Sequence, residues 1–337
     1  MRVGVIGLGY WGPNLARNLS ANPRARLAAL CDLDEARLRS QSRLYPAVRS
    51  TTSLSEVLED ASIDAVAVAT PVRTHFALAK EALLAGKHVL VEKPLATTSV
   101  EAEELISIAE ERGRVLMVDH VFLYSPAVQK LAELHREQVF GEIQFVDSVR
   151  INLGLVQQDV NVIWDLAPHD LSIFDFVLSR TPKSVLAVAN THPGTTMESV
   201  AHLHLDYGDG LIASVHVNWL SPVKIRHLLI GGSRKSALYN DLDGSEPLKL
   251  YDRGVELADG PEERARRLVS YRAGDVVSPK VDRVEPLRNL IEHFAMCAET
   301  GATPLSDGRS GLRLVRALEA ADRSLEKGGV FVDIPDD

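Results

Sequence analysis

Lys93 is the first candidate for chemistry, because it stands where an apolar strand segment ends, in the sequence Glu92-Lys93-Pro94. In a doubly wound parallel sheet the carboxyl ends of the strands face the ligand-binding crevice. An ammonium group placed there could hold a substrate hydroxyl and stabilise the negative charge that develops on its oxygen. From its position alone, the alternative is an ordinary solvated lysine in a loop.

Asp165 and His169 form a second candidate pair, four residues apart at the start of a predicted helix. This spacing places both side chains on one helix face. His169 is suited to be the base that takes a hydroxyl proton, since imidazole exchanges protons near neutral pH, and Asp165 could orient it or anchor a substrate hydroxyl. The same spacing fits an N-cap aspartate and a core histidine equally well.

The segment GLGYWG at residues 7–12 is a G-x-G-x-x-G motif. It follows a predicted strand and opens a predicted helix, which is the context of a dinucleotide-binding turn. Gly7 permits the tight turn, Gly9 lets the backbone approach a pyrophosphate, and Gly12 permits close packing of helix on strand. The helix N-terminus would then offer N–H groups to the phosphates.

Asp32 ends the second predicted strand, 20 residues beyond Gly12. A carboxylate there can accept hydrogen bonds from the ribose hydroxyls of NAD, and it repels the 2′-phosphate of NADP. We therefore expect NAD in preference to NADP, although Arg37 could offset part of this repulsion.

Short apolar segments alternate with helical patterns over the first 120 residues. The predicted strands are 2–6, 27–31, 65–69, 88–91 and 115–118, and the predicted helices are 11–21, 34–45, 54–58, 75–85 and 99–112. This alternation predicts an α/β domain at residues 1–123, with a doubly wound parallel sheet covered on both faces.

Longer strands with two-residue alternation follow after Tyr124. They are predicted at 143–152, 184–190, 200–207, 211–219, 224–230 and 236–240, with helices at 126–137, 285–300 and 309–327. Residues 208–210, Gly-Asp-Gly, predict a hairpin turn. We expect residues 124–337 to form an α+β domain with a mixed or antiparallel sheet, with the final helix free to pack back toward the first domain. Residues 252–283 are predicted to be a long loop.

Composition narrows the class of protein. The chain has 337 residues, a net charge of -9, 45% hydrophobic residues and two cysteines. These values favour a globular two-domain protein, disfavour a non-specific nucleic-acid binder, and fit a reducing compartment. The N-terminus reads as a buried strand rather than a signal peptide, and no apolar run approaches ~18 residues, so we expect a cytoplasmic protein with no membrane span.

Three histidines on alternate positions of the predicted hairpin, His202, His204 and His216, could share one face of a sheet. Three such side chains could hold a metal ion. A semi-polar sheet face at a subunit interface explains them better, so we predict no metal site.

Together these motifs resemble the Gfo/Idh/MocA family, named for glucose-fructose oxidoreductase, inositol dehydrogenase and a rhizopine-catabolism protein. The resemblance covers nearly the whole chain and rests on the segments VGVIGLGYWG, TPVRTHFALAKEALLAGKHVLVEKPLA, WDLAPHDLSIFD and DGRSGLRLVRALEAADRSLEKGG. It implies an N-terminal Rossmann domain and a C-terminal α+β domain whose large open sheet packs against a partner subunit, in a homodimer or homotetramer. It also implies NAD(P)-dependent oxidation or reduction of a sugar, a cyclitol or a similar polyol.

The resemblance also implies roles for single residues. Lys93 matches the active-site lysine, and Asp165 and His169 match the catalytic pair, with His169 as acid and base. The expected cofactor-binding residues are Gly7, Gly9, Tyr10, Trp11, Gly12, Asp32, Arg37, Thr70, Pro71, His75, Glu92, Lys93 and His120.

Residues 157–173 resemble a branch of nucleotide-sugar enzymes that act at C3 of UDP-N-acetylhexosamines or their uronates. We therefore expect an NAD-dependent oxidoreductase acting on a secondary hydroxyl of such a sugar. The alternatives are an inositol or free-hexose dehydrogenase, a deoxysugar 3-ketoreductase and, from another class, a non-catalytic NAD-loaded binding or regulatory protein. A nucleotide-sugar diphosphate would need cations in the second domain, for which the candidates are Lys224, Arg226, Tyr271, Arg272 and Lys280.

Overall fold

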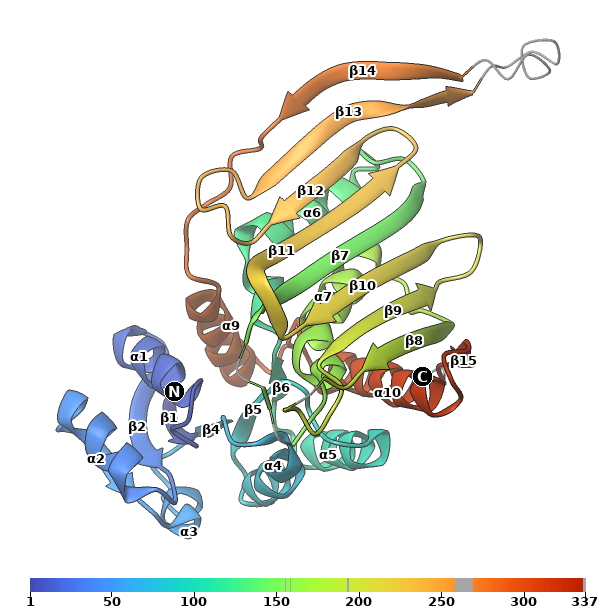
Figure 1. The fold of residues 1–337 in the computed structure, drawn as a ribbon. Helices are drawn as coiled ribbons and strands as arrows, with labels where there is room; N and C mark the ends of the chain where they lie inside the picture. The colour runs from blue at the N-terminus through green and yellow to red at the C-terminus, as the bar shows by residue number, and fades with distance from the viewer. Residues whose placement is uncertain (155, 158, 193, 258–268, 336–337) are drawn as a thin grey trace. The chain divides into compact units, whose positions relative to one another are not determined.

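The computed structural model describes residues 1–154, 156–157, 159–192, 194–257 and 269–335, and Figure 1 shows its ribbon. The chain divides into two compact units. The first consists of Met1–Ser125 and Val284–Glu319, and the second of Pro126–Arg283 with residues 320–335.

The first unit contains a six-stranded sheet whose paired strands are all parallel, in the order β3-β2-β1-β4-β5-β6. Its strands are β1 (Arg2–Ile6), β2 (Arg26–Cys31), β3 (Arg49–Thr51), β4 (Ala65–Val68), β5 (His88–Glu92) and β6 (Leu116–Asp119). The helices between them are α1 (Gly12–Ala21), α2 (Glu35–Leu44), α3 (Leu54–Leu58), α4 (His75–Leu84) and α5 (Ser99–Arg112). Every residue of β4 is buried, as expected of a strand covered on both faces.

This strand order confirms the predicted doubly wound sheet, with its switch point between β1 and β4. The prediction missed β3 because this edge strand has the sequence Arg-Ser-Thr, which carries no apolar signal. The other strands and helices of residues 1–120 lie close to their predicted ranges.

Residues 284–319 also belong to the first unit, although the prediction assigned them to the second domain. They contain helix α9 (Pro286–Thr300) and the start of α10 (Gly308–Glu326). The guanidinium of Arg17 on α1 donates two hydrogen bonds to Glu285, and the Ser306 hydroxyl donates to the carbonyl of Val118 on β6 (2.7 Å). The predicted division into domains at residues 1–123 and 124–337 stays a prediction, because the compact units described here do not show which segments fold independently.

The second unit is built on a mixed nine-stranded sheet in the order β14-β13-β12-β11-β7-β10-β9-β8-β15. The strands are β7 (Ile143–Leu153), β8 (Ser184–Asn190), β9 (Val200–Asp206), β10 (Ile212–Asn218), β11 (Leu220–Gly232), β12 (Ser236–Asn240), β13 (Leu248–Leu257), β14 (Val269–Val277) and β15 (Val332–Asp333). Only β7 and β10 pair in parallel among these described strands. Helices α6 (Pro126–Arg136) and α7 (Val162–Leu178) lie on one face of the sheet, behind it in Figure 1.

The predicted long loop at residues 252–283 is wrong where the chain is described, because most of β13 and β14 falls within it and the two strands pair antiparallel. Charged residues are frequent in both strands, so apolar periodicity did not reveal them. Residues 258–268 of the predicted loop lie outside the described residues.

Helix α7 begins at Val162, earlier than predicted. The Asn161 side chain caps it by accepting hydrogen bonds from the N–H groups of Ile163 (3.0 Å) and Trp164 (3.1 Å). The N-cap interpretation of Asp165 is therefore wrong, and this aspartate projects from the first turn instead.

A buried ion pair fastens α7 to the sheet. Arg150 on β7 donates from Nε and Nη2 to the Asp170 carboxylate, at 2.8 and 3.0 Å, and the Ser148 hydroxyl adds a third bond at 2.8 Å. Both charged side chains are at most 4% exposed. Removing one partner of such a pair leaves an uncompensated buried charge, which costs about 3–5 kcal/mol. The pair therefore fixes how α7 sits on the sheet.

Among the described residues, no helix has the length together with the apolar composition that crossing a bilayer requires.

Candidate functional site

The glycine turn after β1 leaves room for a ligand. Gly7 has φ +90°, and a Cβ built on it would lie 2.5 Å from the carbonyl oxygen of Ala69. A Cβ on Gly12 would collide with the Gly7 carbonyl, so both positions require glycine. At Gly9 a Cβ would meet only Arg37 Nη1, at 3.7 Å. Packing does not demand glycine at position 9, and the space it leaves suits the close approach of a pyrophosphate.

Asp32 ties the glycine turn to the end of β2. Its Oδ2 accepts from the N–H of Leu8 (2.6 Å) and its Oδ1 from the N–H of Asp34 (2.8 Å). Each carboxylate oxygen can accept a second hydrogen bond, so both remain able to receive a ribose hydroxyl. Arg37 Nη1 lies 3.9 Å from Asp32 Oδ2, on a side chain that is 54% exposed. The residues present therefore fit a dinucleotide, whose ribose hydroxyls Asp32 would hold, with the Arg37 guanidinium near that carboxylate.

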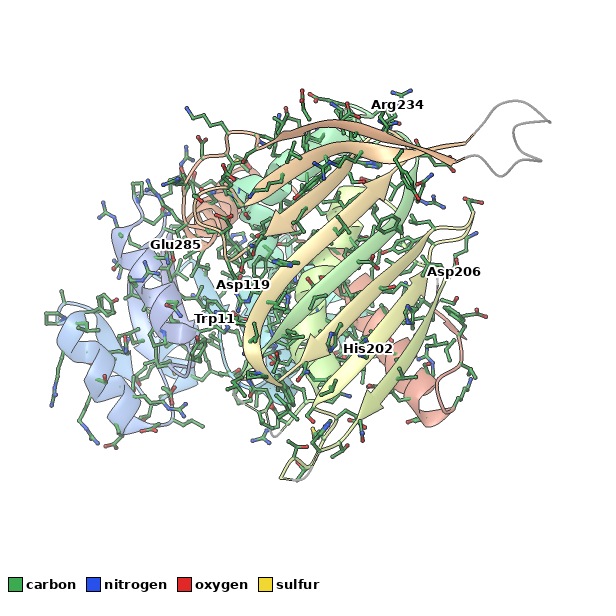
Figure 2. The ribbon with its side chains drawn as sticks, turned by 45° about the horizontal axis from the view of Figure 1, so that its top comes forward. Trp11, Asp119, His202, Asp206, Arg234 and Glu285 are labelled. Carbon is green, nitrogen blue, oxygen red and sulfur yellow. The ribbon has the colours of Figure 1, made fainter. Side chains whose placement is uncertain are left out.

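Two aromatic residues complete the turn. Tyr10 is 75% exposed, and its ring meets that of Trp11 edge to face, with centroids 5.8 Å apart. Trp11 is the N-cap residue of α1 and is labelled in Figure 2. The cofactor contacts expected of both residues stay predictions.

His75 joins the loop after β4 to the turn after Lys93. It is buried, with Nδ1 2.8 Å from the Pro94 carbonyl oxygen and Nε2 2.9 Å from the Thr70 carbonyl oxygen. Because a carbonyl oxygen can only accept, the imidazole makes both bonds at once only in its protonated form. His75 thus positions Pro94 and Thr70. Pro71 is the N-cap residue of the short 3-10 helix Val72–Thr74, which leads from Thr70 to His75.

Glu92 and Asp119 are register partners at the carboxyl ends of β5 and β6, and both side chains are buried. The Lys93 N–H donates to Glu92 Oε2 (2.9 Å), so this carboxyl group holds the backbone of the candidate catalytic lysine. Figure 2 labels Asp119. Among the described residues, no N–H or hydroxyl donor reaches Asp119, and neither ring nitrogen of its neighbour His120 has a hydrogen-bond partner. These buried polar atoms mark the edge of the sheet at which a ligand would meet the first unit.

The protonation of this cluster follows from its burial. Burial first, and the charge of the adjacent Asp119 second, raise the pKa of Glu92 well above its usual value. Burial also raises the pKa of Asp119 to about 7, and it lowers the pKa of His120 to about 3 with a contribution from the Lys93 charge. These directions favour the protonated form of both carboxyl groups and the neutral form of His120 below neutral pH.

The second unit supplies Asp165 and His169, both half-buried on α7. The indole Nε1–H of Trp219 donates to Asp165 Oδ2 (2.9 Å). The structure confirms that the aspartate and the histidine share one helix, four residues apart.

The predicted cofactor residues all lie in the first unit, in or beside the segments that follow β1, β2, β4, β5 and β6. Lys93 is among them, whereas Asp165 and His169 belong to the second unit. Sequence reasoning missed Asp119 and Trp219. Asp119 ends an apolar strand as Glu92 does, so the same signal could have found it. Nothing in the sequence links Trp219 to Asp165, which lies 54 residues away.

Two of the residues considered for binding a substrate diphosphate, Arg226 and Arg272, form ion pairs with carboxylates of the same unit. Arg226 pairs with Asp241 (2.9 Å), and Arg272 pairs with Asp252 (2.9 Å). Tyr271 is 79% exposed. The diphosphate contacts considered for these residues, with Lys224 and Lys280, stay predictions.

The three histidines considered for a metal lie on β9 and β10. His202 stacks on His216 with ring centroids 4.1 Å apart, and His204 Nδ1 lies 3.1 Å from the hydroxyl of Ser214. No group of three or more histidine, cysteine or acidic side chains in the described part of the chain is arranged to hold a metal ion.

The carboxyl pair predicts a pH-dependent stability. Asp119 has a pKa near 7 when folded, against about 3.9 in an unfolded chain, so the folded protein binds the extra proton between these values. The stabilisation is complete below pH 4 and is lost as the pH rises through 7, at up to about 1.4 kcal/mol per pH unit. Asp119→Asn removes this titration, so thermal unfolding of the variant should depend less on pH between 4 and 7. Glu92→Gln should act alike, and an undiminished pH dependence in both variants would contradict the raised pKa values of the buried carboxyl groups.

Two family models match the chain. One, described as an oxidoreductase family with an NAD-binding Rossmann fold, matches residues 1–120, and the other, the GFO/IDH/MocA C-terminal domain, matches residues 128–238. UDP-N-acetylglucosamine 3-dehydrogenase of Acidithiobacillus ferrooxidans is 30% identical over 261 residues, which cover 77% of this chain and 80% of that enzyme. A solved structure of that enzyme, GnnA, has a TM-score of 0.79 at 27% identity and covers 97% of this chain and 98% of that one.

A further relative broadens the comparison. D-Apiose dehydrogenase of Paraburkholderia graminis is 24% identical over 334 residues, covering 96% of this chain and 87% of that enzyme. The two family models together span more than half of the 337 residues. The chain therefore belongs to the Gfo/Idh/MocA family, and it is an oxidoreductase with an NAD-binding Rossmann domain.

Proposed function

We propose that the protein transfers a hydride between a secondary hydroxyl of a sugar and the nicotinamide of NAD. The sugar proposed is nucleotide-activated, with C3 of a UDP-N-acetylhexosamine or its uronate as the reacting carbon. The observation that carries the proposal is the complete set of reactive groups: Lys93 directly after β5, at the edge of the sheet that also carries the glycine turn, and the pair Asp165 and His169 on α7. The 30% identical UDP-N-acetylglucosamine 3-dehydrogenase supports the choice of sugar.

In the proposed oxidation the sugar loses a proton from its hydroxyl oxygen and a hydride from the carbon that bears it. The Lys93 ammonium holds that oxygen and stabilises its developing negative charge. His169 takes the proton as general base, and Asp165 sets the geometry of the hydroxyl or of the imidazole. NAD, when bound, supplies the acceptor for the hydride. In the reverse direction His169 returns the proton to the oxygen.

NAD is proposed as the cofactor in preference to NADP, on the ground that the Asp32 carboxylate would repel a 2′-phosphate. Arg37, 3.9 Å from that carboxylate, acts in the opposite sense.

Two substitutions test this preference. Asp32→Asn should reduce the ratio of kcat/KM for NAD to that for NADP by roughly tenfold, since one like-charge repulsion of about 1.4 kcal/mol is removed. The matched Arg37→Ala variant should raise the same ratio. A wild-type enzyme that turns over faster with NADP would contradict the assignment.

The other candidate substrates are free sugars and cyclitols or a deoxysugar 3-ketone, and D-apiose dehydrogenase is the observation that favours a free sugar. A non-catalytic NAD-loaded protein is the alternative from another class, and the presence of all three reactive residues argues against it.

The cytoplasmic location expected from the two cysteines remains part of this proposal.

A homodimer or homotetramer through the nine-stranded sheet is also proposed. Helices α6 and α7 cover one face of this sheet, and apolar side chains on the other face are accessible, with Val188 46% and Phe145 39% exposed. The stacked His202 and His216 belong to the same alternating set of residues. Burying such a face would require a second copy of the chain, so sedimentation of a monomer at micromolar concentration would contradict the proposal.

The catalytic assignment is tested by Lys93→Met and His169→Gln. Each should lower kcat by at least about 100-fold, since each removes charge stabilisation or proton transfer, and the Kd for NAD in a fluorescence titration should stay within about twofold in His169→Gln. Lys80→Met and His135→Gln are matched controls on α4 and α6, and both should keep normal turnover. The assays would use NAD with UDP-, dTDP- and free sugars and inositols. Near-normal turnover in either catalytic variant would refute the assignment.

A further inference from the structure

We infer that Trp219 is a positioning residue that holds the Asp165 carboxylate through its indole N–H. The distance from Trp219 Nε1 to Asp165 Oδ2 is 2.9 Å. An indole is a donor only, so this contact has one direction and fixes one carboxylate oxygen. The inference rests on the role proposed for Asp165, because the carboxylate must matter to the reaction for its orientation to matter.

Trp219 is itself held in place. It lies between β10 and β11, is 1% exposed, and its N–H donates to the Ser199 carbonyl (3.0 Å). Its own carbonyl accepts from the N–H of Gly154 (2.9 Å). A Cβ on Gly154 would lie 3.2 Å from the Trp219 Cδ1 atom, so the glycine allows this close approach of the backbone to the ring. The indole therefore has little freedom to turn away from Asp165.

Rigid placement of a donor has a chemical consequence at Asp165. The indole bond restricts both side-chain torsions of Asp165 and favours one orientation of the carboxylate toward the hydroxyl or imidazole that it serves. Loss of the bond should thus lower the rate of the reacting complex rather than the affinity for the substrate.

The chain offers a matched control in the same helix. Trp164, next to Asp165, is also buried and donates its indole Nε1–H to an aspartate, Asp322 Oδ2, at 2.7 Å. Asp322 is assigned no part in the reaction. The two tryptophans therefore donate the same kind of hydrogen bond, but only Trp219 donates to a residue of the proposed catalytic set.

The kinetic test compares Trp219→Phe with Trp164→Phe, using NAD and UDP-N-acetylglucosamine. Phenylalanine keeps an aromatic ring and removes the N–H. Trp219→Phe should lower kcat about tenfold, the effect of one hydrogen bond to a charged group, and leave KM within about twofold. Trp164→Phe should leave kcat within about twofold. In an Asp165→Asn background, Trp219→Phe should change the remaining kcat by less than about twofold, because the two residues act through one bond.

A second readout needs no substrate. The chain has three tryptophans, so ¹⁵N-labelled tryptophan gives three indole N–H signals in an NMR spectrum of the full-length protein. Trp219→Phe identifies one of them by its loss. Asp165→Asn should shift that signal more than it shifts the other two, because it changes the acceptor of this indole.

The two proposals can fail separately. An unshifted Trp219 signal in Asp165→Asn, or normal kcat in Trp219→Phe while Lys93→Met and His169→Gln are inactive, would overturn the inference. Normal turnover in those two catalytic variants would overturn the proposed function instead, and the NMR result would still decide whether Trp219 binds Asp165.

Discussion

The ion pair between Arg150 and Asp170 is the interaction on which the proposed catalytic residues of the second unit depend. It joins the middle of β7 to the residue that follows His169, and both side chains are buried. Charges taken out of water are stable only when their partners satisfy them, so α7 cannot slide or turn on the sheet without exposing an unpaired charge. Arg226, the register partner of Arg150 on β11, has its own carboxylate in Asp241, which keeps the two neighbouring guanidinium groups compatible.

In the first unit, polar side chains also hold the structure in place, here by hydrogen bonds to the backbone at the carboxyl ends of the strands. Asp32 fixes the glycine turn through backbone N–H groups, His75 fixes Pro94 through a carbonyl, and Glu92 fixes the backbone of Lys93. The backbone at Leu8, Lys93 and Pro94 is thus held by neighbours within the first unit. Pre-organisation of this kind is what positions reacting groups within a few tenths of an ångström of a productive geometry. The net charge of -9 does not oppose an anionic cofactor, because the N–H groups at the start of α1 and the Lys93 side chain supply positive potential locally.

The sequence was sufficient for the parallel sheet, since its short apolar strands and its glycine turn carry strong local signals. It was also sufficient to nominate Lys93 and Asp32, which follow the ends of β5 and β2, and the pair on α7, whose four-residue spacing places both side chains on one helix. Polar strands were missed, as at β3, β13 and β14, because pairing with a neighbour rather than burial of an apolar run makes them strands. The contacts of Asp119 with Glu92 and of Trp219 with Asp165 depend on strand order and on long-range packing, which a single sequence does not encode locally. The same holds for residues 284–319, whose place in the first unit follows from tertiary contacts.

The central claim is hydride transfer from the carbon of a sugar alcohol to nicotinamide. The most direct test is to incubate the enzyme with NAD and UDP-N-acetylglucosamine deuterated at C3, and to examine the reduced nicotinamide by proton NMR. The proposed function predicts deuterium at C4 of the NADH formed, on one face of the ring. NADH without deuterium, or no NADH at all from this substrate, would contradict oxidation at C3 of a nucleotide sugar.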